Sequence, residues 1–313
     1  RGMTLLELMV ALALGLLVTL AATAALLASR QGLFAVDATS QLRDNARFAQ
    51  EMVQRIGVQA GFRNVFHMQG AGVVVNTAAI TSNPEPAVYG LNDKKRSADP
   101  TSAWDAGEAW DNADLGNSDI LVLRAQTSTS TTGATTSDGT MINCLGGAPT
   151  AAPQDQYDRF ISILHVQKDA SNEPALMCTY KNGDNYKTEP LVQGVENFQV
   201  LYGVDGVAPN ATAAPASTTA DSIPERYLRA DQLTTGDLNV TYANWRRVRS
   251  LRIGMVLRSQ SQTAAIDRES QTFHPLGGSR LFSSTSDPGT IFQPTADGRL
   301  RQVVTFTVHL RNF

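Results

Sequence analysis

The hydrophobic pattern of the chain begins with a long apolar run. From Leu8 to Ala28 there is no charged residue and no proline, and only Gly15, Thr19 and Thr23 interrupt the run. About twenty apolar residues in one helix span the hydrocarbon core of a bilayer, so the run predicts a membrane-spanning helix. A secretory signal peptide is the competing interpretation, but its apolar region is usually shorter and ends in a small-residue cleavage site and a turn.

From Ser29 to Ala60 the pattern becomes amphipathic. Apolar residues recur there at helical spacing, and charged residues occupy the remaining circumference. The apolar positions are Leu42, Ala46, Ala49, Val53 and Ile56. No proline precedes Pro84, and Gly57 and Gly61 are suitable points of termination. The sequence therefore predicts one helix from Met3 to about Ile56, roughly 80 Å long, whose second half packs one face on a globular head.

The rest of the chain has the pattern of short strands. Apolar or alternating runs occur at residues 119–124, 160–166, 195–204, 251–257 and 305–310. No second long helical pattern separates these runs, which favours antiparallel strands over βαβ units. We expect an α+β fold in which the long N-terminal transmembrane and amphipathic helix packs on an antiparallel β-sheet head. Its predicted parts are two residues ahead of the helix at 1–2, a membrane helix at 3–28, an amphipathic half at 29–61 and the head at 62–313.

Two segments between the strands are rich in serine, threonine and alanine. Residues 126–139 and 207–222 have few side chains that could form a core, so we expect exposed loops. An irregular stretch before the first strand contains Trp104 and Trp110, which either anchor that loop on the core or form an exposed contact surface. Anchoring is the favoured interpretation.

Composition limits the partners and the chemistry. The formal net charge is −3 and charged residues make up 18% of the chain, so no global positive field attracts nucleic acid. The basic clusters at 94–96 and 246–249 are too small for more than weak phosphate contact. Cys144 and Cys178 are the only cysteines, and they are expected to form a disulfide in an oxidising compartment, although two buried thiols are the alternative.

One carboxylate lies inside the leading edge of the apolar run. Glu7 is flanked by leucine and methionine, and an ionised group within a membrane costs at least about 2.5 kcal/mol, so it needs a partner. Cleavage after Gly2 would give Met3 a positively charged α-amino group. That amine is badly placed within its own helix, but a neighbouring subunit displaced along the axis could bring its own amine to Glu7.

Residues 1–10 (RGMTLLELMV) resemble the prepilin motif of type IV pilins and pseudopilins. The resemblance implies that a prepilin peptidase cuts after Gly2, that the new terminus at Met3 is methylated, and that Glu7 governs assembly. Residues 1–2 would then be the remnant of a prepilin leader. Further segments resemble PilW-type minor pilins in order and character. These segments are 41–49, 60–63, 174–178, 191–198, 202–205, 245–253 and 299–304.

The resemblance also implies a role and a location. A PilW-type minor pilin is a low-abundance subunit that helps to start a filament and lies at or near its tip. Its partners would be other minor pilins, the major pilin, the inner-membrane assembly platform, the prepilin peptidase and a tip adhesin. The chain would be anchored in the inner membrane with its head in the periplasm before assembly, and would lie in the surface pilus afterwards.

The sequence contains no catalytic motif, so a non-enzymatic subunit without cofactor or metal is expected. His67, His165, His274 and His309 are scattered, as surface or satisfied strand residues would be. An oxygen-rich stretch does not have the spacing of a calcium loop. It comprises Asp105, Asp111, Asn112, Asp114, Asn117 and Asp119. Two alternatives remain open, namely a minor pseudopilin of a type II secretion system and a tip-exposed adhesin or DNA-binding module.

Overall fold

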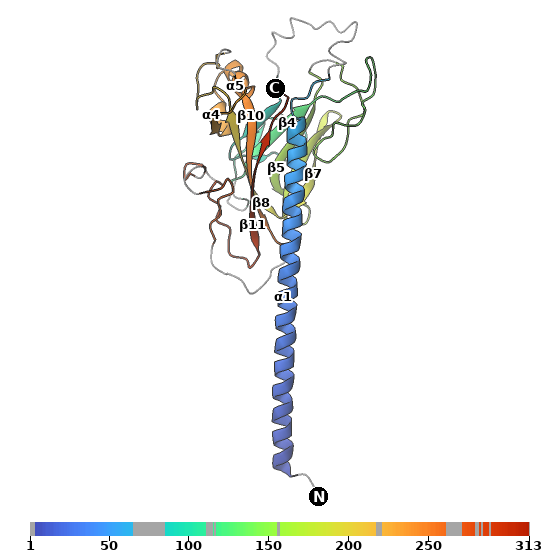
Figure 1. The fold of residues 1–313 in the computed structure, drawn as a ribbon, viewed down its shortest axis with the longest axis vertical. Helices are drawn as coiled ribbons and strands as arrows, with labels where there is room; N and C mark the ends of the chain where they lie inside the picture. The colour runs from blue at the N-terminus through green and yellow to red at the C-terminus, as the bar shows by residue number, and fades with distance from the viewer. Residues whose placement is uncertain are drawn as a thin grey trace.

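The computed structural model describes residues 4–64, 85–110, 115, 117–154, 157–216, 221–260, 271–278, 282, 284–287 and 289–312. In this part of the chain one long helix carries a β-rich head at its C-terminal end (Figure 1). The N-terminus lies at the far end of the helix, whereas the C-terminus lies beside the end of the helix in the head. The α+β class predicted from the hydrophobic pattern is confirmed.

Helix α1 spans Leu5–Gln59. Its 55 residues correspond to about 80 Å at the usual helical rise. The helix ends before Gly61, which has a φ of 79° and whose N–H donates to the carbonyl oxygen of Arg124 at 2.8 Å. Glycine adopts this left-handed conformation without strain, and it is the usual residue just after a helix.

The described residues of the head form two larger antiparallel sheets and one small one. The first has the order β1-β4-β5-β6-β7, with bounds Val88–Leu91, Ile120–Ala125, Phe160–Lys168, Pro174–Asn182 and Asn185–Gln193. The second has the order β11-β10-β8-β9, with bounds Arg301–His309, Val248–Arg258, Val195–Val204 and Arg226–Leu228. Strands β2 (Lys95–Arg96) and β3 (Gly107–Glu108) pair separately, and two short helices, α4 (Ala230–Leu233) and α5 (Leu238–Trp245), precede β10. Each expected strand run therefore lies within or overlaps one of β4, β5, β8, β10 and β11.

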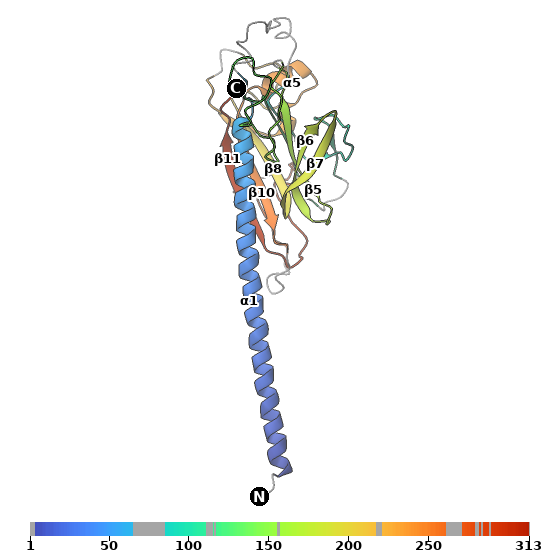
Figure 2. The same cartoon turned by 90° about the vertical axis from the view of Figure 1, so that its right-hand side faces the viewer.

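The C-terminal half of α1 contributes one face to the core. Its buried positions are Ala38, Leu42, Ala46, Ala49, Val53, Ile56 and Gly57. This face contacts β4 and β7 of the first sheet and β10 and β11 of the second, so the helix lies along the junction of the two sheets (Figures 1 and 2). The amphipathic pattern read from the sequence is therefore the pattern of burial against the head.

Polar residues at the start of β4 join the two sheets. The Oδ2 atom of Asp119 accepts a hydrogen bond from the N–H of Val200 at 2.8 Å, and Oδ1 accepts one from Asp93 at 2.9 Å. Ser118 Oγ accepts from the N–H of Phe198 on β8 at 3.0 Å. Burial raises the pKa of Asp119 well above its usual value, while the two backbone donors oppose that rise. The prediction of one sheet on the helix was incomplete, because these contacts hold a second sheet against the first.

A disulfide fastens the connection between β4 and β5 to β6. Cys144 and Cys178 are bonded, with Cα atoms 5.7 Å apart, and both residues are fully buried. The beginning of the same connection is also buried. There the Nδ2 of Asn64 donates to the carbonyl oxygen of Thr127 at 3.1 Å and to Oγ1 of Thr129 at 3.0 Å. The prediction of an exposed loop at 126–139 was therefore wrong for its first residues, whose polar groups bond to the segment that follows α1.

Candidate functional site

The N-terminal half of α1 is the part of the described chain that a globular protein would not leave bare. All residues from 4 to 34 are exposed, including Leu5 (77%), Leu16 (70%) and Val18 (68%). Within it lies an apolar stretch long enough to cross a membrane. Soluble monomers rarely expose apolar surface of this extent, so the half-helix requires a covering of lipid or of other helices.

The N-terminus of α1 places Glu7 in a capping box. Thr4 is the N-cap residue, and its N–H and hydroxyl both donate to Glu7 Oε2 at 3.0 Å. The N–H of Glu7 donates back to Thr4 Oγ1 at 3.4 Å. These reciprocal bonds satisfy donors of the first turn that have no partner within the helix. The sequence signal that predicts this arrangement is Thr-x-x-Glu before an apolar run.

The capping box affects the energy of the Glu7 carboxylate in lipid. Thr4 supplies two hydrogen bonds to Glu7 but no positive charge, so the ionised carboxylate keeps its net charge. A cation from another chain would still lower its energy in an apolar medium. Gly2 and Met3, the residues expected at the processing site, lie outside the described residues.

The remaining polar groups of the apolar stretch bond within the helix. The hydroxyl of Thr19 donates to the carbonyl oxygen of Leu16, and that of Thr23 to the carbonyl oxygen of Leu20, each at 2.9 Å. Backbone groups inside a helix are likewise satisfied, which is the condition for a segment in contact with hydrocarbon. The chemistry of this half-helix therefore suits lipid and helix packing.

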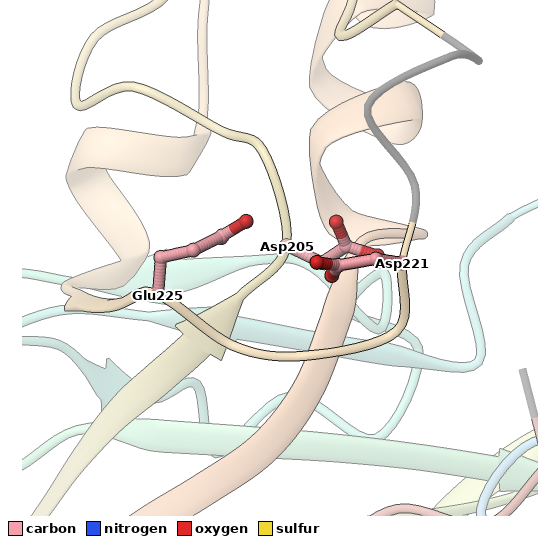
Figure 3. A group of neighbouring side chains, drawn as sticks. All are labelled: Asp205, Asp221 and Glu225. Atoms are coloured by element: carbon pink, nitrogen blue, oxygen red, sulfur yellow. The ribbon is translucent and has the colours of Figure 1, made fainter.

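A cluster of three acidic residues lies in the head, at the end of β8 and before β9. Ligand atoms of Asp205, Asp221 and Glu225 lie within 4.8 Å of one another, and Figure 3 shows the three side chains around one loop. Asp205 is fully buried and pairs with Arg249 at 3.3 Å and Arg247 at 3.6 Å. Because these guanidinium groups already balance Asp205, we interpret the cluster as a closure of the loop between β8 and β9.

The same contacts explain one of the basic clusters. Arg247 and Arg249 turn inward to Asp205, which leaves Arg246 as the exposed member. In the other cluster, Lys95 lies 3.7 Å from Glu108, and Arg96 donates to the carbonyl oxygens of Ser102, Ala103 and Ala106. Neither cluster presents a continuous row of guanidinium and ammonium groups to a nucleic-acid backbone.

The two tryptophans of the irregular stretch anchor it, as predicted. The ring of Trp104 meets Tyr89 edge-on at 5.0 Å, and its Nε1 donates to Glu85 at 2.8 Å. Trp110 donates to the carbonyl oxygen of Ser118 at 3.2 Å. Of the oxygen-rich stretch, Asp119 accepts hydrogen bonds from the N–H groups of Val200 and Asp93, while Asp111, Asn112 and Asp114 lie outside the described residues.

Three of the histidines lie in the described part of the chain. His165 is buried in β5 with Nε2 2.9 Å from Thr179 Oγ1, and His309 is exposed on β11. His309 fits the expectation of a surface residue, whereas His165 is a strand residue that is only partly satisfied, because its buried Nδ1 has no hydrogen-bond partner among the described residues. His274 is half-buried between β10 and β11 in the sequence. His67 lies outside the described residues.

Comparison with known proteins gives a consistent result. Residues 163–312 match the family model described as Type IV Pilus-assembly protein W, and residues 1–23 match the prokaryotic N-terminal methylation motif. Among solved structures, a type IV-like pilin from Thermus thermophilus is similar, with 13% identity and a TM-score of 0.38 over 87% of this chain and 97% of that one. None of the curated proteins matches the sequence.

Proposed function

We propose that the chain is a minor pilin of the family of type IV pilus-assembly protein W, that it helps to start a pilus and that it lies at or near the pilus tip. The observation that carries the proposal is the bare apolar half of α1, headed by one acidic side chain and joined to a head that matches this family. Such a subunit is stored in a membrane and then packed against other helices.

The proposal includes a processing step and a route. Prepilin peptidase cuts after Gly2, the amine of Met3 is methylated, and the subunit waits in the inner membrane with its head in the periplasm. An assembly platform driven by a cytoplasmic motor then moves the helix from lipid into the filament. The N-terminal methylation motif matched at residues 1–23 supports this sequence of events.

Glu7 has a specific role in this proposal. Its carboxylate in the membrane retains a net negative charge despite the two bonds from Thr4. The α-amine of a neighbouring subunit, brought alongside by a shift along the axis, neutralises it. An ionised group in a membrane segment costs roughly 2.5 to 3.5 kcal/mol, so relief of that cost favours the correct neighbour and register.

The proposal is tested by comparing Glu7→Ala with Glu51→Ala in cells. Both changes remove one acid from an exposed position on α1, but only the first lies in the apolar half. Surface pili and twitching should fall at least about tenfold for Glu7→Ala at an unchanged level of membrane-bound subunit, and should stay normal for Glu51→Ala.

Normal piliation with Glu7→Ala would remove the assembly role. A loss of protein secretion with intact piliation would instead assign the chain to a secretion pseudopilus. Mass spectrometry of the mature chain provides an independent check, because a start other than methylated Met3 leaves Glu7 without its proposed cation.

A further inference from the structure

A cavity of about 460 Å³ opens between the two sheets at the end of the head where α1 terminates. Its walls come from Ala60 and Gly61 after α1, the segment that leads into β1, the residue before β5, the end of α5 and the residues after β11. Pro86, Val88 and Leu310 give it an apolar lining. This volume lies in the range of cavities that hold small organic ligands.

Three arginines line this cavity. Arg63 and Arg246 are exposed at its rim, while Arg159 is half-buried. Glu85 is the one acidic residue among the described lining residues, and it is already engaged. Its carboxylate lies 3.2 Å from Arg124 Nε and accepts a hydrogen bond from Trp104 at 2.8 Å. The cavity therefore carries an excess of positive charge.

Arg159 differs from the other arginines that are not exposed. In the described part of the chain each of the others bonds to a carboxylate or a carbonyl oxygen. They are Arg96, Arg124, Arg229, Arg247, Arg249, Arg252, Arg258, Arg299 and Arg301. The guanidinium of Arg159 has no such bond to any described residue, and its Nε is buried.

The surroundings of Arg159 make this position costly. Burial, followed by the repulsion of Arg124 and then of Arg63 and Arg246, lowers the pKa of Arg159 to about 10, although the negative charge of Glu85 opposes this fall. The guanidinium is thus still ionised at neutral pH, partly desolvated and beside like charges. A half-buried cation without a partner is an expensive feature, which an incoming anion would relieve.

A second donor without a partner belongs to the same cavity. Trp245 lines it and is 1% exposed, and its indole Nε1–H has no acceptor among the described residues. The ring is held by Tyr89 and Tyr202, with centroids 4.7 and 4.6 Å away, so it cannot turn to find one without disturbing the aromatic cluster. A buried tryptophan normally donates this hydrogen bond.

Arg159 thus brings a cation without a hydrogen-bond partner among the described residues to a cavity that is also lined by Pro86, Val88 and Leu310. We propose that this cavity binds an oxyanion, a carboxylate or a phosphate, that is attached to an apolar group. Arg159 would hold the oxyanion, Arg63 and Arg246 would attract it from the rim, and Trp245 would contact the apolar part. Guanidinium groups favour carboxylate and phosphate because their donors match the spacing of the oxygens.

The proposal is tested by calorimetric titration of the full chain in non-ionic detergent micelles, with protein-free micelles as the blank. Benzoate and phenyl phosphate are the probes, inorganic phosphate reports the oxyanion alone, and benzyl alcohol is the neutral match. The aromatic anions should bind at least about tenfold more tightly than benzyl alcohol, and the affinity should fall with added salt. Comparison of benzoate with phenyl phosphate distinguishes the two oxyanions.

Substitutions of three arginines, one of them a control, locate the site. Arg159→Gln should weaken binding of the aromatic anions at least about tenfold, whereas Arg226→Gln, which removes an exposed arginine from β9, should change it less than about twofold. The thermal midpoint of unliganded Arg159→Gln should equal or exceed that of the wild type, because an unpaired cation is removed. Arg63→Gln, at the exposed rim, should weaken binding several-fold without involving the core.

Three results would overturn the proposal. They are no binding of either aromatic anion up to about 10 mM, equal binding of benzyl alcohol, or unchanged affinity in both Arg159→Gln and Arg63→Gln. None of these outcomes depends on the role of Glu7 or on pilus assembly.

Discussion

The buried His165 makes the stability of the head depend on pH in a way that one substitution can isolate. The ring lies in β5, 1% exposed, with Nε2 2.9 Å from Thr179 Oγ1. Burial, followed by the charge of Arg96, lowers the pKa of His165 to about 3. In the unfolded chain a histidine titrates at about 6.5, so between these values the unfolded state binds a proton that the folded state does not.

The sign and size follow from this difference. Because the unfolded state binds more protons, the free energy of unfolding falls as the pH falls below about 6.5, with a slope that approaches 1.4 kcal/mol per pH unit. Between pH 7 and 4.5 the contribution of His165 amounts to about 2.5 kcal/mol. His165→Gln removes the titration and keeps an amide that can bond to Thr179.

The assay is urea unfolding of the full chain in non-ionic detergent, with the disulfide intact and tryptophan fluorescence as the signal. The wild type should lose about 2.5 kcal/mol more than His165→Gln between pH 7 and 4.5, whatever the variant's stability at pH 7. His309→Gln, an exposed change on β11, is the control and should follow the wild type. Parallel pH curves for the wild type and His165→Gln would refute the argument.

Two further predictions concern the covalent and backbone restraints of the head. Replacing both Cys144 and Cys178 by serine opens a link across 34 positions and should lower the free energy of unfolding by about 4 kcal/mol in urea, while a change below about 1 kcal/mol would contradict the loop-closure estimate. Gly61→Ala should cost at least about 2 kcal/mol, because φ is 79° and an added Cβ would lie 1.9 Å from the carbonyl oxygen of Asn312. Gly133→Ala is its control, because Gly133 has a φ of 77° and open space around an added Cβ. Thermal or urea unfolding measures both variants, and an equal loss of unfolding free energy in the two would show that the close contact at Gly61 is unimportant.

The long helix illustrates how much of the fold the sequence could predict. An apolar run without charge or proline, followed by a stripe at Leu42, Ala46, Ala49 and Val53, is a local pattern, and helical periodicity alone assigns its buried face. The same holds for strands such as β8 and β10, whose residues alternate or are uniformly apolar. The division of these strands into two sheets was not predicted, because strand pairing depends on residues far apart in the chain. Strands β7 and β9 were not predicted themselves, because β7 has a mostly polar, half-exposed pattern and β9 is only three residues long.

The cavity beside the end of α1 shows what sequence patterns cannot give. Arg63, Arg159 and Arg246 are separated by many residues, and none lies in a motif that links it to the others. They meet because α1 ends, β5 begins and α5 ends at one place between the sheets. Conversely, the basic run 246–249 looked like one cluster, but Arg247 and Arg249 point to Asp205 and share its carboxylate.

The sequence by itself determined the elements whose information is local: the apolar half-helix, the amphipathic half, the acid at position 7 and the main strands. Period and composition suffice for these, because each residue's environment is set by neighbours within a few positions. The tertiary structure alone decided which charges are paired, where the two sheets join and where a cavity remains. Those outcomes depend on contacts between residues far apart in the chain, such as Asp119 with Val200, and no local pattern encodes them.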